Sequence, residues 1–325
     1  MQQLVDGLGE VVEDRQQVGA DLLVGGEQAD QDPGQNDPVT ALHVSADRGQ
    51  EDGQGPNQEQ DCSGQQEGAA IDQILSRPTL HVDETSLRVD RKNHWIHVYA
   101  SGDITCKFLH PKRGGEAIEA INLIPRYGGT IVHDCWASYL AYDHCDHGLC
   151  GSHLLRELTF VVETNAYRWA ANLKRLLTQT CTQVAKSPAK CLSATDYKNL
   201  RKRYRNLLTR GEKELPTIPP RQNGKRGRVA KSDAHNLWER FKRHEQAVLL
   251  FAKHPEVPFT NNRAERDLRM SKVKQKVSGC FRSRQYAEAY CRISSYLQTM
   301  AYRGYNPLLA IQMALSGELY AQGGE

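Results

Sequence analysis

The first 75 residues contain no Phe, Trp, Tyr or Lys, and they are crowded with Gln, Gly, Asp and Glu. A segment of this composition cannot bury enough apolar surface to offset the entropy that it would lose on ordering. We therefore expect residues 1–73 to form an acidic, Gln- and Gly-rich disordered segment. The folded part is expected to begin near Ile74 and to extend over residues 74–325.

The chain also lacks any apolar run of about 18 residues, so no membrane span is expected. Its N-terminus has neither the basic start nor the apolar stretch of a signal peptide. The nine cysteines are an odd number scattered over a long chain, which argues against the disulfide framework of a secreted protein. These absences predict a cytoplasmic protein with reduced thiols.

Charge is divided unevenly along the chain. Residues 1–75 hold 16 acidic and 2 basic residues, a balance of −14, which leaves +17 for the remainder of a chain whose total is +3. A positive balance of this size on the folded part suits a polyanionic partner, and nucleic acid is the usual one. A merely solvated basic surface is the alternative.

Beyond Ile74 the residue pattern is that of a mixed α/β domain. Runs rich in β-branched and aromatic residues predict three antiparallel strands with short connections, at residues 79–87, 94–101 and 104–111. A helical pattern at 114–124 followed by an apolar strand at 130–134 predicts a strand–helix–strand crossover. The pattern then becomes helical, and we interpret residues from about 160 to 255 as an inserted, all-helical subdomain. Three further helices are predicted, the first starting near Asn261 and the last at Asn306.

Two aspartates lie where apolar strands meet polar turns. Asp83 is in the segment HVDET, and Asp134 ends the segment TIVHD. Residues at neighbouring strand ends of an α/β sheet converge on one crevice, so these carboxylates are placed to share hard divalent cations. Taken singly, each could instead be an ordinary turn residue.

A third acid, Glu265, lies in a predicted helix with a basic side. Glu265, Arg269, Lys272 and Lys276 are spaced by four, three and four residues, so they line one face of that helix. Basic residues beside a metal-binding carboxylate can hold phosphates next to the ions. The alternative for Glu265 is a solvated partner of a neighbouring Arg.

A basic loop without aromatic residues, 221–231, suits contact with backbone phosphates and gives no sequence readout. The residues that we expect to contact DNA are Arg269, Lys272, Lys274, Lys276, Lys225, Arg226 and Arg228.

The segments HVDET, VHDCWASY, CGSHLLREL and TNNRAERDLR, with the run from Lys274 to Arg282, resemble the transposases of the insertion sequence 66 family. The resemblance covers about Leu75 to Leu315. It implies a ribonuclease H-like fold, a mixed α/β sheet flanked by helices, with an all-helical insertion between the second Asp and the Glu. It also implies that Asp83, Asp134 and Glu265 are the catalytic residues of a DDE transposase.

The same resemblance implies that these three acids bind two Mg²⁺ ions, for which Mn²⁺ could substitute. The implied reaction is metal-dependent cleavage and strand transfer of a bacterial insertion element. The implied partners are transposon ends, target DNA and further copies of the chain in a homo-oligomer, in the cytoplasm and at the nucleoid.

Cysteine and histidine crowd residues 144–153, and thiolate with imidazole at short spacing can bind zinc. However, Cys150-x-x-His153 resembles a signature found after the second Asp in several transposase groups, where it supports the active site. We therefore expect Cys150 and His153 to be structural supports, together with Asn261 and Asn262 near the start of the Glu265 helix. Zinc binding and a direct role of His153 in positioning DNA are the less favoured alternatives.

Members of this family carry helical DNA-binding and zinc-binding elements ahead of the first catalytic Asp. The acidic segment before Ile74 matches none of these, which indicates a rearranged or truncated start. The alternative function is therefore a catalytically inactive DNA-binding remnant or repressor, which would keep the basic surface without needing the acids. A ribonuclease H-type or Holliday-junction nuclease is a third hypothesis.

Overall fold

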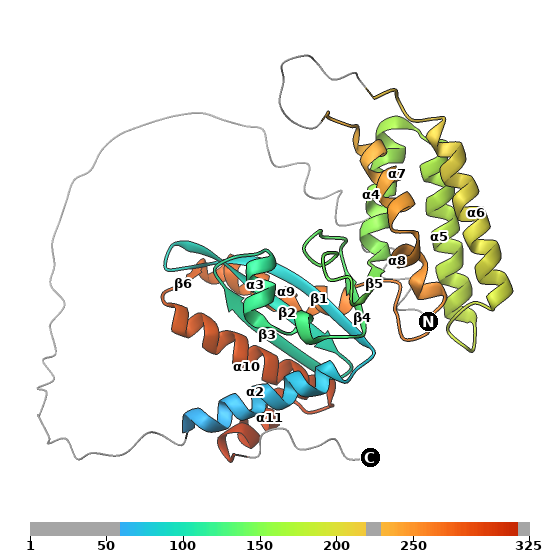
Figure 1. Ribbon diagram of the computed structural model, residues 1–325. Coiled ribbons are helices and arrows are strands. Elements are labelled where there is room, and N and C mark those ends of the chain that lie inside the picture. Colours follow the sequence, from blue (N-terminus) through green and yellow to red (C-terminus); the bar gives the residue numbers. More distant parts are fainter. Residues whose placement is uncertain (1–58, 219–228, 318–325) are drawn as a thin grey trace, which may run out of the picture. The chain divides into compact units, whose positions relative to one another are not determined.

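Six strands form one mixed sheet in the computed structural model, which describes residues 59–218 and 229–317 (Figure 1). The strands are β1 (Thr79–Val89), β2 (Lys92–Ser101), β3 (Ile104–His110), β4 (Thr130–His133), β5 (Asp146–Leu149) and β6 (Cys280–Phe281). Their order is β3-β2-β1-β4-β5, with β6 paired to β1. β2 pairs antiparallel with both β1 and β3. β4 and β6 each pair parallel with β1, and β5 pairs parallel with β4. The predicted meander and crossover strand are thus confirmed.

Helices lie on both sides of the sheet, which confirms a mixed α/β architecture. They are α2 (Glu59–Leu75), α3 (Gly115–Ile121), α9 (Asn262–Ser278), α10 (Arg284–Tyr302) and α11 (Pro307–Leu315), with a 3-10 turn η1 (Ile124–Arg126). One core joins Leu87 and Val98 of the sheet to Leu268 of α9 and Cys291 of α10. A second core joins Leu80 and Val82 to residues of α2 and α3 on the opposite face.

The described residues between 151 and 252 are mostly helical, and they lie between β5 and the loop that leads to α9. The helices are α4 (Gly151–Asn165), α5 (Arg168–Lys186), α6 (Ala194–Glu212), α7 (Asp233–Arg243), α8 (Glu245–Leu249) and the 3-10 turn η2 (Leu250–Ala252). Their core contains Trp169, Tyr204 and Phe241, and the Tyr204 hydroxyl donates to the Phe241 carbonyl at 2.8 Å. This helical subdomain begins at Gly151, earlier than the expected start near residue 160, because α4 follows β5 almost directly.

Two elements depart from the expected organisation. Helix α2 occupies part of the segment that we expected to be disordered, and its Ala70 and Ile74 are buried against the sheet core. The rest of that segment, up to residue 58, lies outside the described residues. Strand β5 was not predicted, because Asp-His-Gly-Leu lacks the branched and aromatic residues that mark strands. No helix in the described ranges is long and apolar enough to cross a membrane.

Candidate active site at the strand ends

The parallel pairing of β1 and β4 brings the two aspartates side by side. The register pairs His81 with Val132. β4 ends at His133, and the same register, if extended by two residues, would set Asp83 beside Asp134. The two carboxylates lie close enough for the negative charge of Asp134 to raise the pKa of Asp83.

On the other side of β4, His133 pairs with Leu149 of β5. Asp134 and Cys150, which follow these two residues, are therefore neighbours. Asp134 directly follows β4, as expected of a strand-end residue, and Cys150 directly follows β5. The same expectation was wrong for Asp83, which lies inside β1, because this strand continues to Val89 in its pairing with β2.

Asp83 lies in a crowded, negatively charged environment. Burial raises its pKa to about 7, and the negative charges of Glu84 and Asp134 act in the same direction. The N–H of Glu84, which donates to Asp83 Oδ1 at 2.8 Å, and the nearby charge of Lys272 oppose the rise. A bound cation would relieve this electrostatic penalty, so the donor set fits a hard divalent ion.

A tight turn holds Asp134 at the end of β4. The Asp134 carboxylate accepts the N–H of Trp136 at 3.1 Å. Between them Cys135 has φ of 73°, in the left-handed region that non-glycine residues seldom adopt. The N–H of Cys135 donates to Nδ1 of the buried His133 at 3.1 Å, which stabilises this backbone conformation.

Asn261 fastens the start of α9 to β1 immediately before Asp83. Its side-chain amide donates to the Val82 carbonyl at 2.8 Å, and its Oδ1 lies 2.9 Å from His81 Nδ1. Its backbone N–H donates to Cys150 Sγ at 3.2 Å. Asn261 occupies the N-cap position of α9, but its side chain makes no capping hydrogen bond to the helix. Instead it ties the helix that carries Glu265 to β1, and its backbone ties the helix to Cys150, which follows β5.

The Glu265 carboxylate faces Cys150 and His153. Its Oε1 lies 3.8 Å from Cys150 Sγ and 3.6 Å from His153 Nδ1. One ligand atom from each of the three residues lies within 4.8 Å of the others. The structure thus brings Asp83 and Asp134 together. It places the Glu265 carboxylate beside Cys150 and His153.

The other acid of α9 is structural. Asp267 is 1% exposed and accepts the Thr105 hydroxyl at 2.6 Å, the Tyr302 hydroxyl at 2.7 Å and Arg263 Nε at 3.0 Å. These bonds join α9 to β3 and α10. Glu265, whose side chain is 36% exposed, is consequently the acid of this helix that solvent and ligands can reach.

The basic side of α9 is open to solvent. Arg269, Lys272 and Lys276 are exposed, and Lys274 is half-buried with its ammonium 4.2 Å from the Phe281 ring centroid. Asn262 is also exposed. The buried face of α9 is formed by Ala264, Asp267, Leu268 and Ser271. Of the other residues expected to contact DNA, Lys225, Arg226 and Arg228 lie outside the described residues.

Glu84, next to Asp83, was not singled out from the sequence. Its side chain is 1% exposed and forms an ion pair with Arg113 at 2.6 Å. It also accepts the Tyr139 hydroxyl at 2.6 Å, and the Arg113 guanidinium lies 4.4 Å from the Trp136 ring centroid. Burial raises the pKa of Glu84. Strand alternation turns Glu84 to the face opposite Asp83, where it anchors the loops after β3 and β4.

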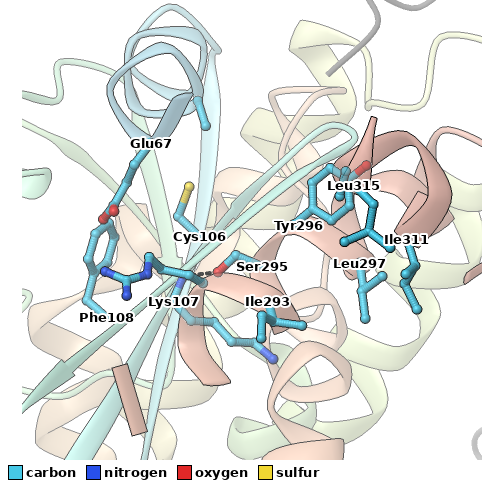
Figure 2. Close-up of a pocket in the computed structure, with 13 residues that line it drawn as sticks. Glu67, Cys106, Lys107, Phe108, Ile293, Ser295, Tyr296, Leu297, Ile311 and Leu315 are labelled. Atoms are coloured by element: carbon cyan, nitrogen blue, oxygen red, sulfur yellow. Dashed lines mark hydrogen bonds between the residues drawn. The ribbon is translucent and has the colours of Figure 1, made fainter. Parts of the chain in front are cut away.

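A cavity of about 510 Å³ lies elsewhere, among α2, β3, α10 and α11 (Figure 2). Phe108, Ile293 and Leu315 contribute to its apolar lining, and the Lys107 N–H donates to Ser295 Oγ at 2.8 Å on its wall. None of the three acids lines it. The cavity is therefore separate from the candidate active site.

Comparison with known proteins identifies one family. The model of the "Transposase IS66 family" matches residues 65–289, which is more than half of the chain, so the chain belongs to this family. No curated protein and no solved structure matches.

Proposed function

We propose that this member of the IS66 transposase family cleaves DNA at the ends of an insertion element and joins the freed 3′-hydroxyl to target DNA. The observation that carries the proposal is the proximity of Asp83, on β1, to Asp134, which directly follows the neighbouring parallel strand β4. Glu265 lies on a helix that Asn261 fastens to β1. We also propose that the sheet and its helices form a ribonuclease H-like catalytic domain, with residues 151–252 as its helical insertion.

Asp83, Asp134 and Glu265 would hold two divalent cations, Mg²⁺ or Mn²⁺. When bound, such ions activate an attacking water or hydroxyl and stabilise the leaving oxygen of a phosphodiester. Carboxylates are the ligands that these hard cations prefer. The Glu265 carboxylate contacts Cys150, which follows β5 next to β4, and we propose that it completes the set.

The basic side of α9 would hold the DNA backbone against these acids. Lys272 is close enough to Asp83 to lower its pKa, so a phosphate bound by Lys272 would lie next to the proposed metal site. Arg269 and Lys276 extend the same exposed side along the helix. These contacts would position DNA without reading its sequence.

The test is cleavage of a duplex that carries the inverted repeats flanking the gene, with Mg²⁺ as the added ion. Asp83→Asn, Asp134→Asn and Glu265→Gln should each reduce the cleavage rate by at least roughly a hundredfold, because each removes a carboxylate that would hold the ions stabilising the transition state. The control is Asp146→Asn, at the opposite, amino end of β5, where the acid is exposed. This variant should cleave at the wild-type rate.

DNA binding separates the proposal from a non-catalytic, DNA-binding remnant. Asp83→Asn should bind DNA with nearly unchanged, salt-sensitive affinity, since binding rests on the basic side of α9. Binding without any metal-dependent cleavage by the wild-type chain would establish the remnant instead. Cleavage that survives in Asp83→Asn would refute the assignment of the three acids.

A further inference from the structure

Cys150, His153 and Glu265 form a compact cluster of soft and hard ligands beside the two aspartates. Cys150 directly precedes α4, and His153 is the third residue of that helix. Glu265 reaches the pair from the first turn of α9. The Cys150 sulfur is fixed by the Asn261 N–H at 3.2 Å, so the cluster is built on two anchored helix starts.

Two of the ligand-atom separations are close to those around a tetrahedral ion, and all three lie within 4.8 Å. Zinc binds sulfur at about 2.3 Å and imidazole nitrogen or carboxylate oxygen at about 2.0–2.1 Å, so its ligands lie roughly 3.3–3.6 Å apart. Glu265 Oε1 lies 3.6 Å from His153 Nδ1 and 3.8 Å from Cys150 Sγ. A nitrogen–oxygen distance of 3.6 Å is too long for a hydrogen bond but close to that of two atoms sharing an ion.

His153 supplies an independent observation. Its Nδ1 atom is buried and has no hydrogen-bond partner, although the side chain as a whole is 32% exposed. A buried imidazole nitrogen without a partner is costly, and a metal ion is one way to satisfy it.

We propose that Cys150, His153 and Glu265 bind one thiophilic divalent cation, Zn²⁺, with a fourth position open to water. Binding displaces the thiol proton of Cys150 to solvent and leaves a thiolate–imidazole–carboxylate set. Three protein ligands with an open fourth position are a common zinc arrangement. The position of Glu265 thus adds a third ligand to a Cys-x-x-His pair for which the sequence alone favoured a structural role.

The site has a regulatory consequence that rests on the proposed function. Because Glu265 is also assigned to the magnesium site, Zn²⁺ at the cluster would hold this carboxylate away from Asp83 and Asp134. Zinc should therefore inhibit magnesium-dependent cleavage, and His153→Ala should make cleavage less sensitive to zinc.

Metal binding is tested on the full chain without DNA, using Co²⁺ as the probe and Zn²⁺ as the competitor. Chelator-treated protein should bind one Co²⁺ with the near-ultraviolet charge-transfer band of a cobalt–thiolate bond, and Zn²⁺ should abolish the band. Cys150→Ser should lose the band. His153→Ala and Glu265→Gln should retain it with affinity weakened by roughly tenfold or more.

Cys280→Ser is the control because Cys280 is the exposed thiol among the described residues. Circular dichroism of every variant checks folding, and the two variants that keep Cys150 preserve the test if Cys150→Ser does not fold. The proposal is overturned if the wild-type chain shows no thiolate band, or if the band depends on Cys280. Cobalt binding without DNA cleavage would refute the proposed function alone, whereas cleavage without cobalt binding would refute the zinc site alone.

Discussion

Replacing Asn261 by Ala should lower the stability of the protein, because the Asn261 side chain bonds the start of α9 to β1. Asn261 is 2% exposed, and its side chain bonds the Val82 carbonyl and His81 Nδ1. The substitution leaves the buried Val82 carbonyl and the partly buried His81 ring without this partner, at about 1–3 kcal/mol each, so the free energy of unfolding should fall by about 2–6 kcal/mol. That is a large part of the roughly 5–15 kcal/mol by which a domain is stable.

The assay is urea unfolding followed by circular dichroism. If the slope is about 3 kcal/mol per M, a loss of about 3 kcal/mol lowers the midpoint by about 1 M without changing the slope. The neighbouring residue is a matched control, because Asn262 is the same residue type but exposed. Asn262→Ala should change the free energy of unfolding by no more than about 0.5 kcal/mol. Equal effects of the two substitutions would refute the bridging role of Asn261.

Three other predictions concern titration, packing and DNA affinity. Burial lowers the pKa of His97 to about 4, so its contribution to stability is complete above about pH 6.5 and is lost as pH falls toward 4. The loss of about 3 kcal/mol should be absent in His97→Gln when urea midpoints are compared at pH 7 and pH 4. Gly151→Ala would set a Cβ 2.2 Å from the Phe259 ring, so thermal unfolding should reveal a destabilisation of about 1–3 kcal/mol; an unchanged melting temperature would contradict the packing. Lys276→Ala should lower DNA affinity uniformly across sequences and reduce the salt slope by about 1, and an unchanged slope would place DNA elsewhere.

The local amino-acid sequence was sufficient to predict the strands that follow Ile74, because β1, β2 and β3 are rich in β-branched or aromatic residues and are joined by short turns. It was not sufficient for β5, whose four residues are a strand only through parallel pairing with β4. Helix α2 was missed for a similar reason. Its polar composition predicts disorder, but Ala70 and Ile74 find an apolar surface on the sheet.

For the candidate site, the sequence indicated which acids to consider but not what surrounds them. Apolar runs that stop at polar residues marked Asp83 and Asp134 as strand-end residues, which is right for Asp134 and wrong for Asp83, since β1 continues to Val89. The parallel pairing of β1 with β4 explains their proximity. The contact of Glu265 with Cys150 spans 115 residues, and no local spacing predicts such a contact. Whether these acids catalyse cleavage stays a prediction.

The bonds between early strands and late helices also determine when the site can exist during synthesis. Thr105 on β3 bonds Thr299 on α10, which lies 194 residues later in the chain. Since α9 and α10 complete a core begun by β1 and β2, a ribosome-bound chain that ends before Glu265 carries both aspartates on a sheet whose α9–α10 face is uncovered. At about 5–20 residues per second, roughly ten to forty seconds separate the synthesis of Asp83 from that of Glu265. A nascent chain therefore cannot assemble the complete set of acids until nearly all of it has been translated.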